Sequence, residues 1–325
     1  MSTGAPIGVI VMAYGTAAGP DDIERYHTDI RGGRAPSPEH LQQLKDRYAA
    51  IDNAFPLLDI TRAQAEGMVE RLNAAMGAGR FRAYLGMKHS PPFISEGVAQ
   101  MRDDGIERAI GIVMAPHWSG MSVETYVELV QQALDSGGPE FTFVREYGAH
   151  PAFTAFLAAR VRAALATLPD EQADDAGVIF SAHSLPVRTL EDGSQRCLRC
   201  DCDHSCRYRD GLQDTADVVS ALLGGLPHVA IAWQSAGRTA DPWWGPPIED
   251  VIRGQAAEGR PAVVVCSAGF VADHLETLYD LDIEARRIAE DAGIGFARTR
   301  MPNADPAYLD VLALVVRDHL AGVGA

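Results

Sequence analysis

The chain has 325 residues, a length that suits two domains of roughly 150 residues each. Hydrophobic residues make up 47% of it and charged residues 22%, which is ordinary for a globular protein. The 44 acidic residues outnumber the 28 basic ones, and the formal net charge of −16 argues against nucleic acid or anionic lipid as the main partner. No apolar run approaches the ~18 residues of a membrane helix, and residues 1–12 lack the basic start of a secretory signal. We therefore expect a cytoplasmic protein with no integral membrane segment.

Short apolar runs and amphipathic segments alternate along the chain. The runs predict strands at residues 7–12, 82–87, 109–114, 141–144, 177–180, 229–233 and 262–266. Helical periodicity predicts helices at residues 38–50, 61–75, 122–135, 152–166, 208–223, 271–291 and 306–320. Continuously apolar strands that alternate with helices are typical of parallel sheets covered on both faces. We expect an α/β fold of two doubly wound domains, residues 1–150 and 151–304. A C-terminal helix in residues 305–325 is expected to pack back on the first domain.

Side chains that can carry out chemistry follow several of the predicted strands. In open parallel sheets, clefts form outside the carboxyl ends of the strands. A concentration of such residues there predicts a site between the two sheets. The residues are Tyr14, Lys88, His89, His117, His183 and Ser235.

His183 lies directly after one of these strands, in the segment 180–186. A histidine there can be a general base, a metal ligand, or a packed side chain satisfied by the neighbouring backbone. A neutral imidazole with an ordinary pKa of ~6.5 suits the removal of protons from a weak N–H acid. Position alone leaves these roles open.

Three carboxylates are spaced four residues apart in the predicted helix 271–291. They are Glu276, Asp280 and Glu284, and this spacing places them on one helical face. Such a face can simply be solvated. A carboxylate ladder that begins near a cleft can instead carry a hydrated divalent cation inward or protons outward. Oxygen and imidazole ligands suit Fe(II) or Mg(II) better than a soft metal.

Four of the five cysteines lie within ten residues, at Cys197, Cys200, Cys202 and Cys206. In an intracellular chain, thiols clustered this closely indicate a metal rather than disulfides. Four thiolates can hold either zinc or an iron–sulfur cluster. The fifth, Cys266, lies among apolar residues and is predicted to be part of the core.

Several long motifs resemble those of the ferrochelatase family and occur in the family's order. They are Ser-Ala-His-Ser-Leu-Pro at 181–186, Trp-Gln-Ser-Ala-Gly at 233–237 with Asp-Pro-Trp-Trp-Gly-Pro at 241–246, and Ala-Gly-Phe-Val-Ala-Asp-His-Leu-Glu-Thr-Leu-Tyr-Asp-Leu-Asp at 268–282. Shorter matches lie at residues 11–16, 29–38 and 86–89. The resemblance implies two Rossmann-like, chelatase-type domains with a porphyrin bound in the cleft between them. It also implies a lyase of haem biosynthesis that inserts ferrous iron into the porphyrin.

Residue by residue, the resemblance assigns the chemistry to His183 and Glu276, which would meet the iron from opposite sides of the macrocycle. Metallation must remove two N–H protons and strip water from Fe(II), so both a base and an anionic ligand are needed. Asp280 and Glu284 would line a path for the incoming iron. Which of His183 and Glu276 takes the first proton stays open.

The resemblance also bears on the substrate. Family members that use coproporphyrin III are similar to this chain in having a tyrosine after the first strand, here Tyr14. The other substrate-binding residues that it implies are Ile30, Arg31, Arg47 and Tyr126. The chain departs from the family at Phe55, where a serine is usual, so one hydroxyl contact is missing.

The product expected from coproporphyrin III is coproheme. The alternatives are protoporphyrin IX as substrate, cobalt as metal, and a non-catalytic tetrapyrrole carrier or Fe–S sensor. The chain is expected to act as a monomer. Some bacterial ferrochelatases resemble it in carrying a 2Fe–2S cluster on an internal cysteine-rich insertion, here residues 197–206, with zinc as the alternative occupant.

Overall fold

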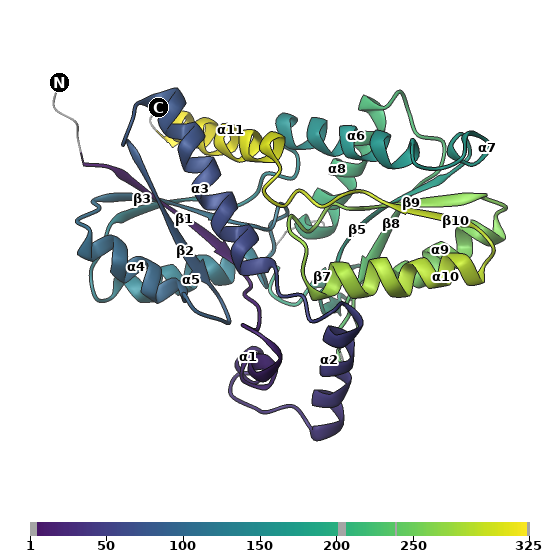
Figure 1. Ribbon diagram of the computed structural model, residues 1–325, viewed down its shortest axis with the longest axis horizontal. Coiled ribbons are helices and arrows are strands. Elements are labelled where there is room, and N and C mark those ends of the chain that lie inside the picture. The colour runs from purple at the N-terminus through teal and green to yellow at the C-terminus, as the bar shows by residue number, and fades with distance from the viewer. Residues whose placement is uncertain (1–4, 201–205, 238, 324–325) are drawn as a thin grey trace.

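Two four-stranded parallel sheets, one from each half of the chain, form the framework of the computed structural model (Figure 1). The structure describes residues 5–200, 206–237 and 239–323. The strand order is β2-β1-β3-β4 in the first sheet and β10-β9-β5-β8 in the second. Helices flank both sheets, so the predicted α/β fold is confirmed.

The seven predicted strands are all present, with ends shifted by at most three residues. The sheets contain β1 (Ile7–Ala13), β2 (Phe81–Met87), β3 (Arg108–Val113), β4 (Glu140–Val144), β5 (Gly177–His183), β8 (Val229–Gln234), β9 (Ala262–Ser267) and β10 (Gly295–Arg298). The prediction missed β10, a four-residue strand that begins with glycine. It also missed the antiparallel hairpin of β6 (Val187–Thr189) and β7 (Gln195–Cys197). Strands this short carry too little periodicity to be recognised.

The seven predicted helices are also present, although one of them has a different start and geometry. The α-helices are α1 (Ile23–Ile30), α2 (Pro38–Ala50), α3 (Leu57–Met76), α4 (Ile94–Asp103), α5 (Val123–Leu134), α6 (Pro151–Leu165), α7 (Asp170–Ala173), α8 (Arg207–Leu222), α9 (Ile248–Ala257), α10 (Arg286–Asp291) and α11 (Pro306–Val323). The prediction missed α1, α4, α7 and α9, which have ten residues or fewer. A 3-10 turn at Pro20–Asp22 precedes α1, and a π-helix, Glu276–Ala285, precedes α10. None of the described helices is long and apolar enough to cross a membrane.

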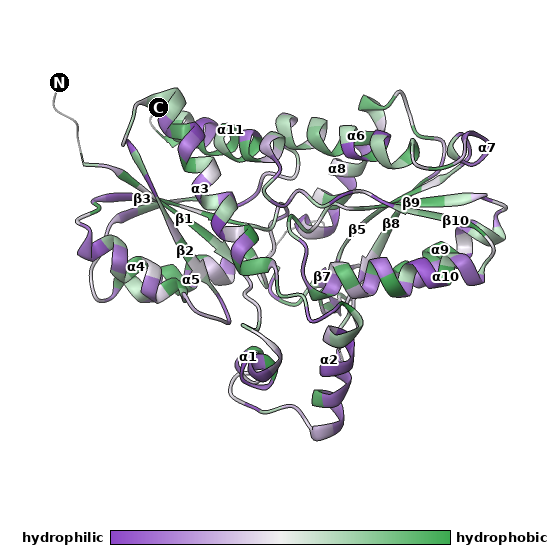
Figure 2. Ribbon diagram, in the orientation of Figure 1, coloured by the Kyte–Doolittle hydropathy of each residue, from purple (hydrophilic) through white to green (hydrophobic). Residues whose placement is uncertain are grey.

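Strand β1 illustrates why these apolar runs form central strands. Every residue of β1 is buried, and alternate side chains enter different clusters. Val9 and Val11 pack on one face of the sheet, whereas Ile10 and Met12 pack on the other. A strand with a period of two can bury all its side chains only if both faces are covered. The apolar interior of the sheets is visible in Figure 2.

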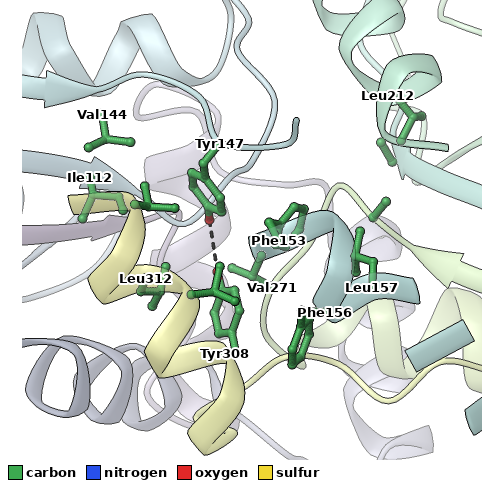
Figure 3. Packing of buried hydrophobic residues seen from close by; sticks show 14 of the residues in the cluster. Ile112, Val144, Tyr147, Phe153, Phe156, Leu157, Leu212, Val271, Tyr308 and Leu312 are labelled. Carbon is green, nitrogen blue, oxygen red and sulfur yellow. Dashed lines mark hydrogen bonds between the residues drawn. The ribbon is translucent and has the colours of Figure 1, made fainter. Parts of the chain in front are cut away.

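One hydrophobic cluster spans both halves of the chain. It joins side chains of both sheets with α3, α6 and α11, which lie along the same side of the molecule (Figures 1 and 3). At its centre Tyr308 of α11 packs beside Phe153 of α6, and the hydroxyl of Tyr308 lies 3.1 Å from that of Tyr147. Helix α11 contacts both α3 and α6. The division into domains at residue 150 stays a prediction.

The two sheets share one topology, and this determines where their strand ends can form a site. In each sheet the first strand, β1 or β5, lies in the middle, and the next two strands of the sheet in chain order lie on opposite sides of it. Connections therefore diverge at the ends of β1 and β5, and a crevice forms at such switch points. Tyr14 follows β1 and His183 ends β5.

Candidate active site

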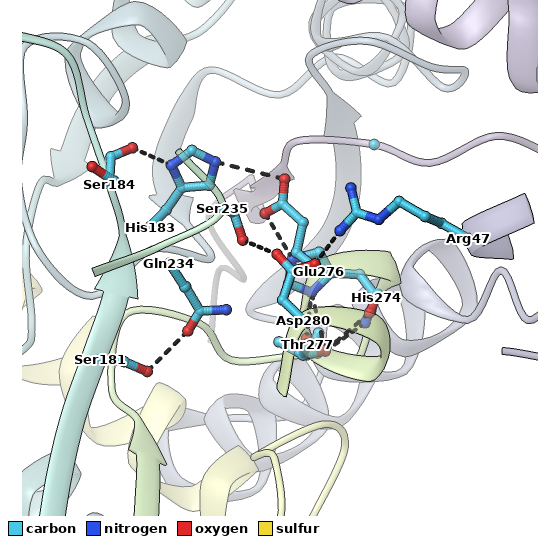
Figure 4. A network of polar contacts seen from close by, with 12 residues as sticks. Arg47, Ser181, His183, Ser184, Gln234, Ser235, His274, Glu276, Thr277 and Asp280 are labelled. Atoms are coloured by element: carbon cyan, nitrogen blue, oxygen red, sulfur yellow. Dashed lines mark hydrogen bonds and ion pairs between the residues drawn. The ribbon is translucent and has the colours of Figure 1, made fainter. Parts of the chain in front are cut away.

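His183 and Glu276 face one another at the end of the second sheet (Figure 4). His183 is the last residue of β5, and Glu276 is the first of the π-helix. His183 Nε2 lies 3.6 Å from Glu276 Oε1, and His183 Nδ1 makes a short contact with the carbonyl oxygen of Ser184. The backbone acceptor fixes the orientation of the ring and points Nε2 toward Glu276.

Each member of this pair changes the acidity of the other. About a third of each side chain stays open to solvent, yet the surrounding protein removes much of the bulk water. This desolvation lowers the pKa of His183, but the charge and hydrogen bond of Glu276 outweigh it, so the pKa of His183 is raised. Desolvation likewise raises the pKa of Glu276. His183, and His274 at 3.5 Å from Oε2, more than reverse this, so the pKa of Glu276 lies far below its usual range. The pair thus favours an imidazolium next to a carboxylate.

The helix that carries Glu276 differs from the sequence prediction. The predicted helix began at Val271, whereas the π-helix begins at Glu276. Residues 271–274 are not helical, and Thr277 Oγ1 accepts a hydrogen bond of 3.0 Å from the backbone N–H of His274. Hydrogen bonds from i to i+5 widen the turns, a feature frequent at functional sites. The α-helical geometry assumed for the carboxylate ladder is therefore wrong.

Glu276, Asp280 and Glu284 nevertheless line the same cavity, which has a volume of about 600 Å³. Asp46 and Glu249 also line it, so five carboxylates surround this space. Opposing charge comes from Arg47, whose guanidinium lies 4.6 Å from the ring of Tyr279.

Asp280 is the most buried carboxylate of this cavity, with 7% of its side chain exposed. Its two oxygens receive short contacts from Arg47 and from Ser235 Oγ (Figure 4). Desolvation and the charges of Glu276 and Glu284 raise the pKa of Asp280 to about 6, against the opposing effects of Arg47 and Ser235. Asp280 therefore gains or loses a proton close to neutral pH.

Tyr14 lies at the end of β1, in the first half of the chain. Its ring meets His89 edge-on, with centroids 4.6 Å apart, and His89 Nδ1 lies 2.7 Å from Asp29 Oδ1. Burial among neighbouring groups raises the pKa of Tyr14, and the charges of Glu276 and Asp29 add to this. Its phenol is protonated at neutral pH although 44% of the residue is exposed.

Lys88 and Tyr126 form a second group beside Tyr14. Lys88 Nζ donates a hydrogen bond of 2.9 Å to Thr125 Oγ1 and lies 5.5 Å from the ring of Tyr126. Tyr126 is only 4% exposed, and burial raises its pKa. The structure thus places Tyr126 close to Tyr14 but inside the protein.

The remaining predicted substrate residues lie on or next to α1 and α2. These two helices stand apart from the sheets (Figure 1). Ile30 packs into their small apolar cluster, and Arg31, directly after it, is exposed. Phe55 stacks on Tyr48 with centroids 4.6 Å apart, so its ring is used in packing. Of these predicted substrate residues, Arg47 lines the carboxylate cavity, where it pairs with Asp280.

The cysteine-rich segment is described only in part, because Cys202 lies outside the described residues. Cys197, Cys200 and Cys206 are buried, and the sulfurs of Cys197 and Cys206, which are free thiols, are 3.3 Å apart. Cys200 is disulfide-bonded, so the expectation of metal-binding thiols rather than disulfides is not met at this residue. Among the described residues, no group of three or more His, Cys, Asp or Glu side chains is arranged to hold a metal ion.

Sequence reasoning did not assign a role to Tyr208 or Trp244, which both contact the site. Tyr208 donates a hydrogen bond to the carbonyl of His183, and Trp244 donates one to Cys197 Sγ. The sequence indicated Trp244 only as a member of the family motif at residues 241–246. No local pattern reveals partners that lie this far away along the chain.

Comparison with known proteins agrees with this architecture. The sequence profile of the ferrochelatase family matches residues 6–320. Coproporphyrin III ferrochelatase of Anoxybacillus flavithermus is 43% identical over 320 residues, which cover 98% of this chain and 98% of that protein. The Bacillus subtilis enzyme of the same name is 42% identical over 316 residues, covering 97% and 98%. The Listeria monocytogenes enzyme is 40% identical over 312 residues, covering 95% and 97%.

Solved structures of other chelatases share the fold at low identity. SirB from Bacillus subtilis with Fe³⁺ has a TM-score of 0.57 and 9% identity, covering 96% of this chain and 95% of its own. CbiX, the terminal enzyme for biosynthesis of siroheme in denitrifying bacteria, has a TM-score of 0.54 and 12% identity, covering 96% and 98%. These similarities bear on the fold alone.

The raised pKa of Asp280 predicts that the free energy of unfolding falls as the pH rises and this carboxyl group ionises. The folded chain holds this proton up to about pH 6, whereas an unfolded aspartate loses it near 3.8. Stability from this group is therefore present at low pH and is lost as the pH rises toward 6. We expect Asp280→Asn to stabilise the protein by about 1–3 kcal/mol at pH 7–8. The gain should shrink toward pH 5 in urea unfolding measured across this range.

Asp282→Asn is the matched control, because Asp282 forms a bidentate ion pair with Arg298 at 2.7 Å and is not part of the cavity. It should lower stability at neutral pH. A loss of stability in Asp280→Asn at pH 7 would mean that the Arg47 ion pair, and not desolvation, dominates at this position.

Proposed function

The chain belongs to the ferrochelatase family, and from this premise we propose that it inserts ferrous iron into coproporphyrin III to give coproheme in haem biosynthesis. Its relatives at 40–43% identity over nearly the whole length carry this activity in their names. The reaction forms metal–nitrogen bonds, which makes the protein a lyase. A cytoplasmic location and a monomeric state stay predictions from the sequence.

The observation that carries the proposal is the His183–Glu276 pair at the rim of a cavity lined by carboxylates. A base and an anionic oxygen ligand, both of which metallation of a porphyrin needs, lie 3.6 Å apart. No macrocycle fits between two groups this close, so both are proposed to meet the porphyrin from the same face, and the expectation that they lie on opposite sides of it is wrong. The other carboxylates of the cavity offer the hard oxygen ligands that a hydrated divalent iron prefers. Asp280 and Glu284 are proposed to line the path by which the iron arrives.

The electrostatics suggest an order for the proton transfers. In the resting protein Glu276 is ionised and raises the pKa of His183, which favours the imidazolium. Iron that binds Glu276 cancels this negative charge and repels the imidazolium, so the pKa of His183 falls. The proton of His183 then passes to solvent, to which about a third of its side chain is open, and Nε2 is free to accept one from a pyrrole N–H. Arrival of the metal thereby prepares the base.

Residues near Tyr14 support coproporphyrin as the substrate. This porphyrin carries four propionates, and cationic side chains bind carboxylates through charge-assisted hydrogen bonds. Arg31 is exposed beyond α1, and Lys88 lies between Tyr14 and Tyr126. The protonated phenol of Tyr14 is proposed to approach the ring from the face opposite His183. A protoporphyrin substrate would leave some of these cations without partners.

For the cysteines we propose a 2Fe–2S cluster held by Cys197, Cys200, Cys202 and Cys206, which requires the disulfide of Cys200 to be reduced first. Two thiolates at about 2.3 Å from one tetrahedral metal lie about 3.8 Å apart. The 3.3 Å between Cys197 Sγ and Cys206 Sγ is near this distance and well beyond an S–S bond. The hydrogen bond between the two thiols lowers the pKa of Cys206 and raises the pKa of Cys197, so it favours a thiolate at Cys206 alone. Such a cluster would fix the cysteine loop, and no step of the reaction passes through it.

Substitution of the proposed catalytic pair tests the reaction. His183→Ala and Glu276→Gln should each lower kcat for iron insertion by about 100-fold or more, because general acid–base catalysis contributes at least that much. The controls are His228→Ala and Glu290→Gln, which should keep activity. His228 directly precedes β8, at the end of that strand opposite to Gln234, and Glu290 is exposed on α10. Near-normal rates in both His183→Ala and Glu276→Gln would rule out this mechanism. Tight porphyrin binding without metallation by the wild type would indicate a carrier.

The choice of porphyrin tests the substrate. In detergent-free buffer, kcat/KM for coproporphyrin III should exceed that for protoporphyrin IX. Arg31→Ala should raise KM for coproporphyrin, because a propionate loses a charge-assisted partner. Arg62→Ala, on the exposed side of α3, should leave it unchanged. A preference of the wild type for protoporphyrin would contradict the proposal.

Visible absorption of anaerobically purified protein tests the occupant of the cysteine site. A 2Fe–2S cluster should absorb between about 300 and 600 nm, whereas zinc is colourless because its d shell is full. Cys197→Ser and Cys206→Ser should abolish the bands. Cys266→Ala should keep them, because Cys266 is buried in β9, outside residues 197–206. If the wild-type protein were colourless and contained zinc, the 2Fe–2S proposal would be wrong and the cysteines would bind zinc.

A further inference from the structure

The cysteine loop, residues 197–206, begins next to the segment that follows His183. Strands β6 and β7 form a hairpin in which Val187, four residues after His183, pairs with Cys197. The backbone N–H of Leu198 donates a hydrogen bond of 3.1 Å to the carbonyl of Pro186. The first cysteine of the loop is therefore held next to the chain that leaves the catalytic histidine.

Tyr208 connects the other end of this loop to His183. Cys206 is the N-cap of α8, and Tyr208 is the second residue of that helix. The Tyr208 hydroxyl donates a hydrogen bond of 2.9 Å to the carbonyl oxygen of His183. Its ring packs against Trp233, with centroids 5.5 Å apart. Tyr208 therefore links the helix N-terminus at Cys206 to the His183 peptide.

Trp244 makes a second connection from the opposite side. Its indole N–H donates a hydrogen bond of 3.2 Å to Cys197 Sγ. Its carbonyl accepts a bond of 2.8 Å from Ser184 Oγ, and its backbone N–H donates one of 3.0 Å to Leu185. One residue thus holds both a cysteine sulfur and the two residues that follow His183.

These bonds bear on the imidazole itself. His183 Nδ1 bonds to the carbonyl of Ser184, so the ring orientation depends on where that carbonyl points. Ser184 is held through its hydroxyl by Trp244 and through its N–H by the carbonyl of Gln234, at 2.7 Å. Partners of this kind around a reactive imidazole commonly change activity by 10–100-fold when removed.

We propose that Tyr208 and Trp244 are positioning residues that hold His183 toward Glu276, and that through them the cysteine loop controls the placement of the imidazole. The inference rests on the proposed role of His183 in iron insertion. It assigns the cysteine site an effect on the active site through packing and hydrogen bonds, with no electron transfer.

Conservative substitutions separate positioning from simple packing. Tyr208→Phe removes one hydroxyl, and Trp244→Phe removes the indole N–H while keeping an aromatic ring. Each should lower kcat about tenfold and leave KM for coproporphyrin III within about twofold. Tyr147→Phe is the control, because it removes a buried hydroxyl bonded to Tyr308, far from His183 in the shared core. Equal losses in all three variants would mean general destabilisation and would overturn the proposal.

A spectroscopic readout makes the test independent of activity. With ¹⁵N-histidine labelling, the ring resonances of His183, assigned by their absence in His183→Gln, report its hydrogen bonding. Tyr208→Phe and Trp244→Phe should shift them in the metal-free, porphyrin-free site, and Tyr147→Phe should not. If the wild type inserted no iron, the proposed function would fail, while these shifts would still decide whether His183 is positioned as described.

A double-mutant cycle tests the connection to the cysteines. Cys197→Ser removes the sulfur that accepts the Trp244 N–H, so it should shift the His183 resonances and lower kcat. In the Trp244→Phe background the same change should add little, because the connection is already broken. Circular dichroism checks that each variant is folded. Additive effects of the two substitutions would show that the cysteine does not act through Trp244, and this part of the proposal would be wrong.

Discussion

The site depends on one partly buried charge, the carboxylate of Glu276, which lines the cavity. An ionised group in such a place costs free energy unless charges and hydrogen bonds compensate for it. His183 supplies that compensation from β5, and His274 supplies it from the irregular segment before the π-helix. The same carboxylate raises the pKa of His183 and of Asp280. The charge of Glu276 thus affects the protonation of both His183 and Asp280.

Several features follow from keeping this charge where it is. The π-helix starts at Glu276 and brings Asp280 and Glu284 to the same cavity. Arg47 comes from α2, far away in sequence, and neutralises part of the resulting negative charge. Behind His183, hydrogen bonds from Tyr208 and Trp244 hold the peptide that orients the imidazole. The shared core of α3, α6 and α11 spans the two sheets that carry these groups.

Much of the fold was predictable because it is encoded locally. Val9 to Met12 form a continuously apolar run, and such a run is stable only as a strand covered on both faces. The chain order of strands and helices then led to two parallel sheets. Short elements escaped prediction, because four residues such as Gly295–Arg298 carry no clear period. The helix around Glu276 was predicted but given the wrong start and geometry, since α and π turns differ by a backbone hydrogen bond that no side-chain pattern specifies.

The sequence by itself determined the fold class and the clustering of four cysteines. It also identified His183 and Glu276, within family motifs, as candidates for proton and metal chemistry. Tertiary structure decided which of these groups meet. It set the 3.6 Å approach of His183 to Glu276, the pairing of Arg47 with Asp280, and the bond from Trp244 to Cys197. The physical reason is that local patterns report burial and backbone geometry. Contacts between segments tens to hundreds of residues apart exist only once the two sheets have packed.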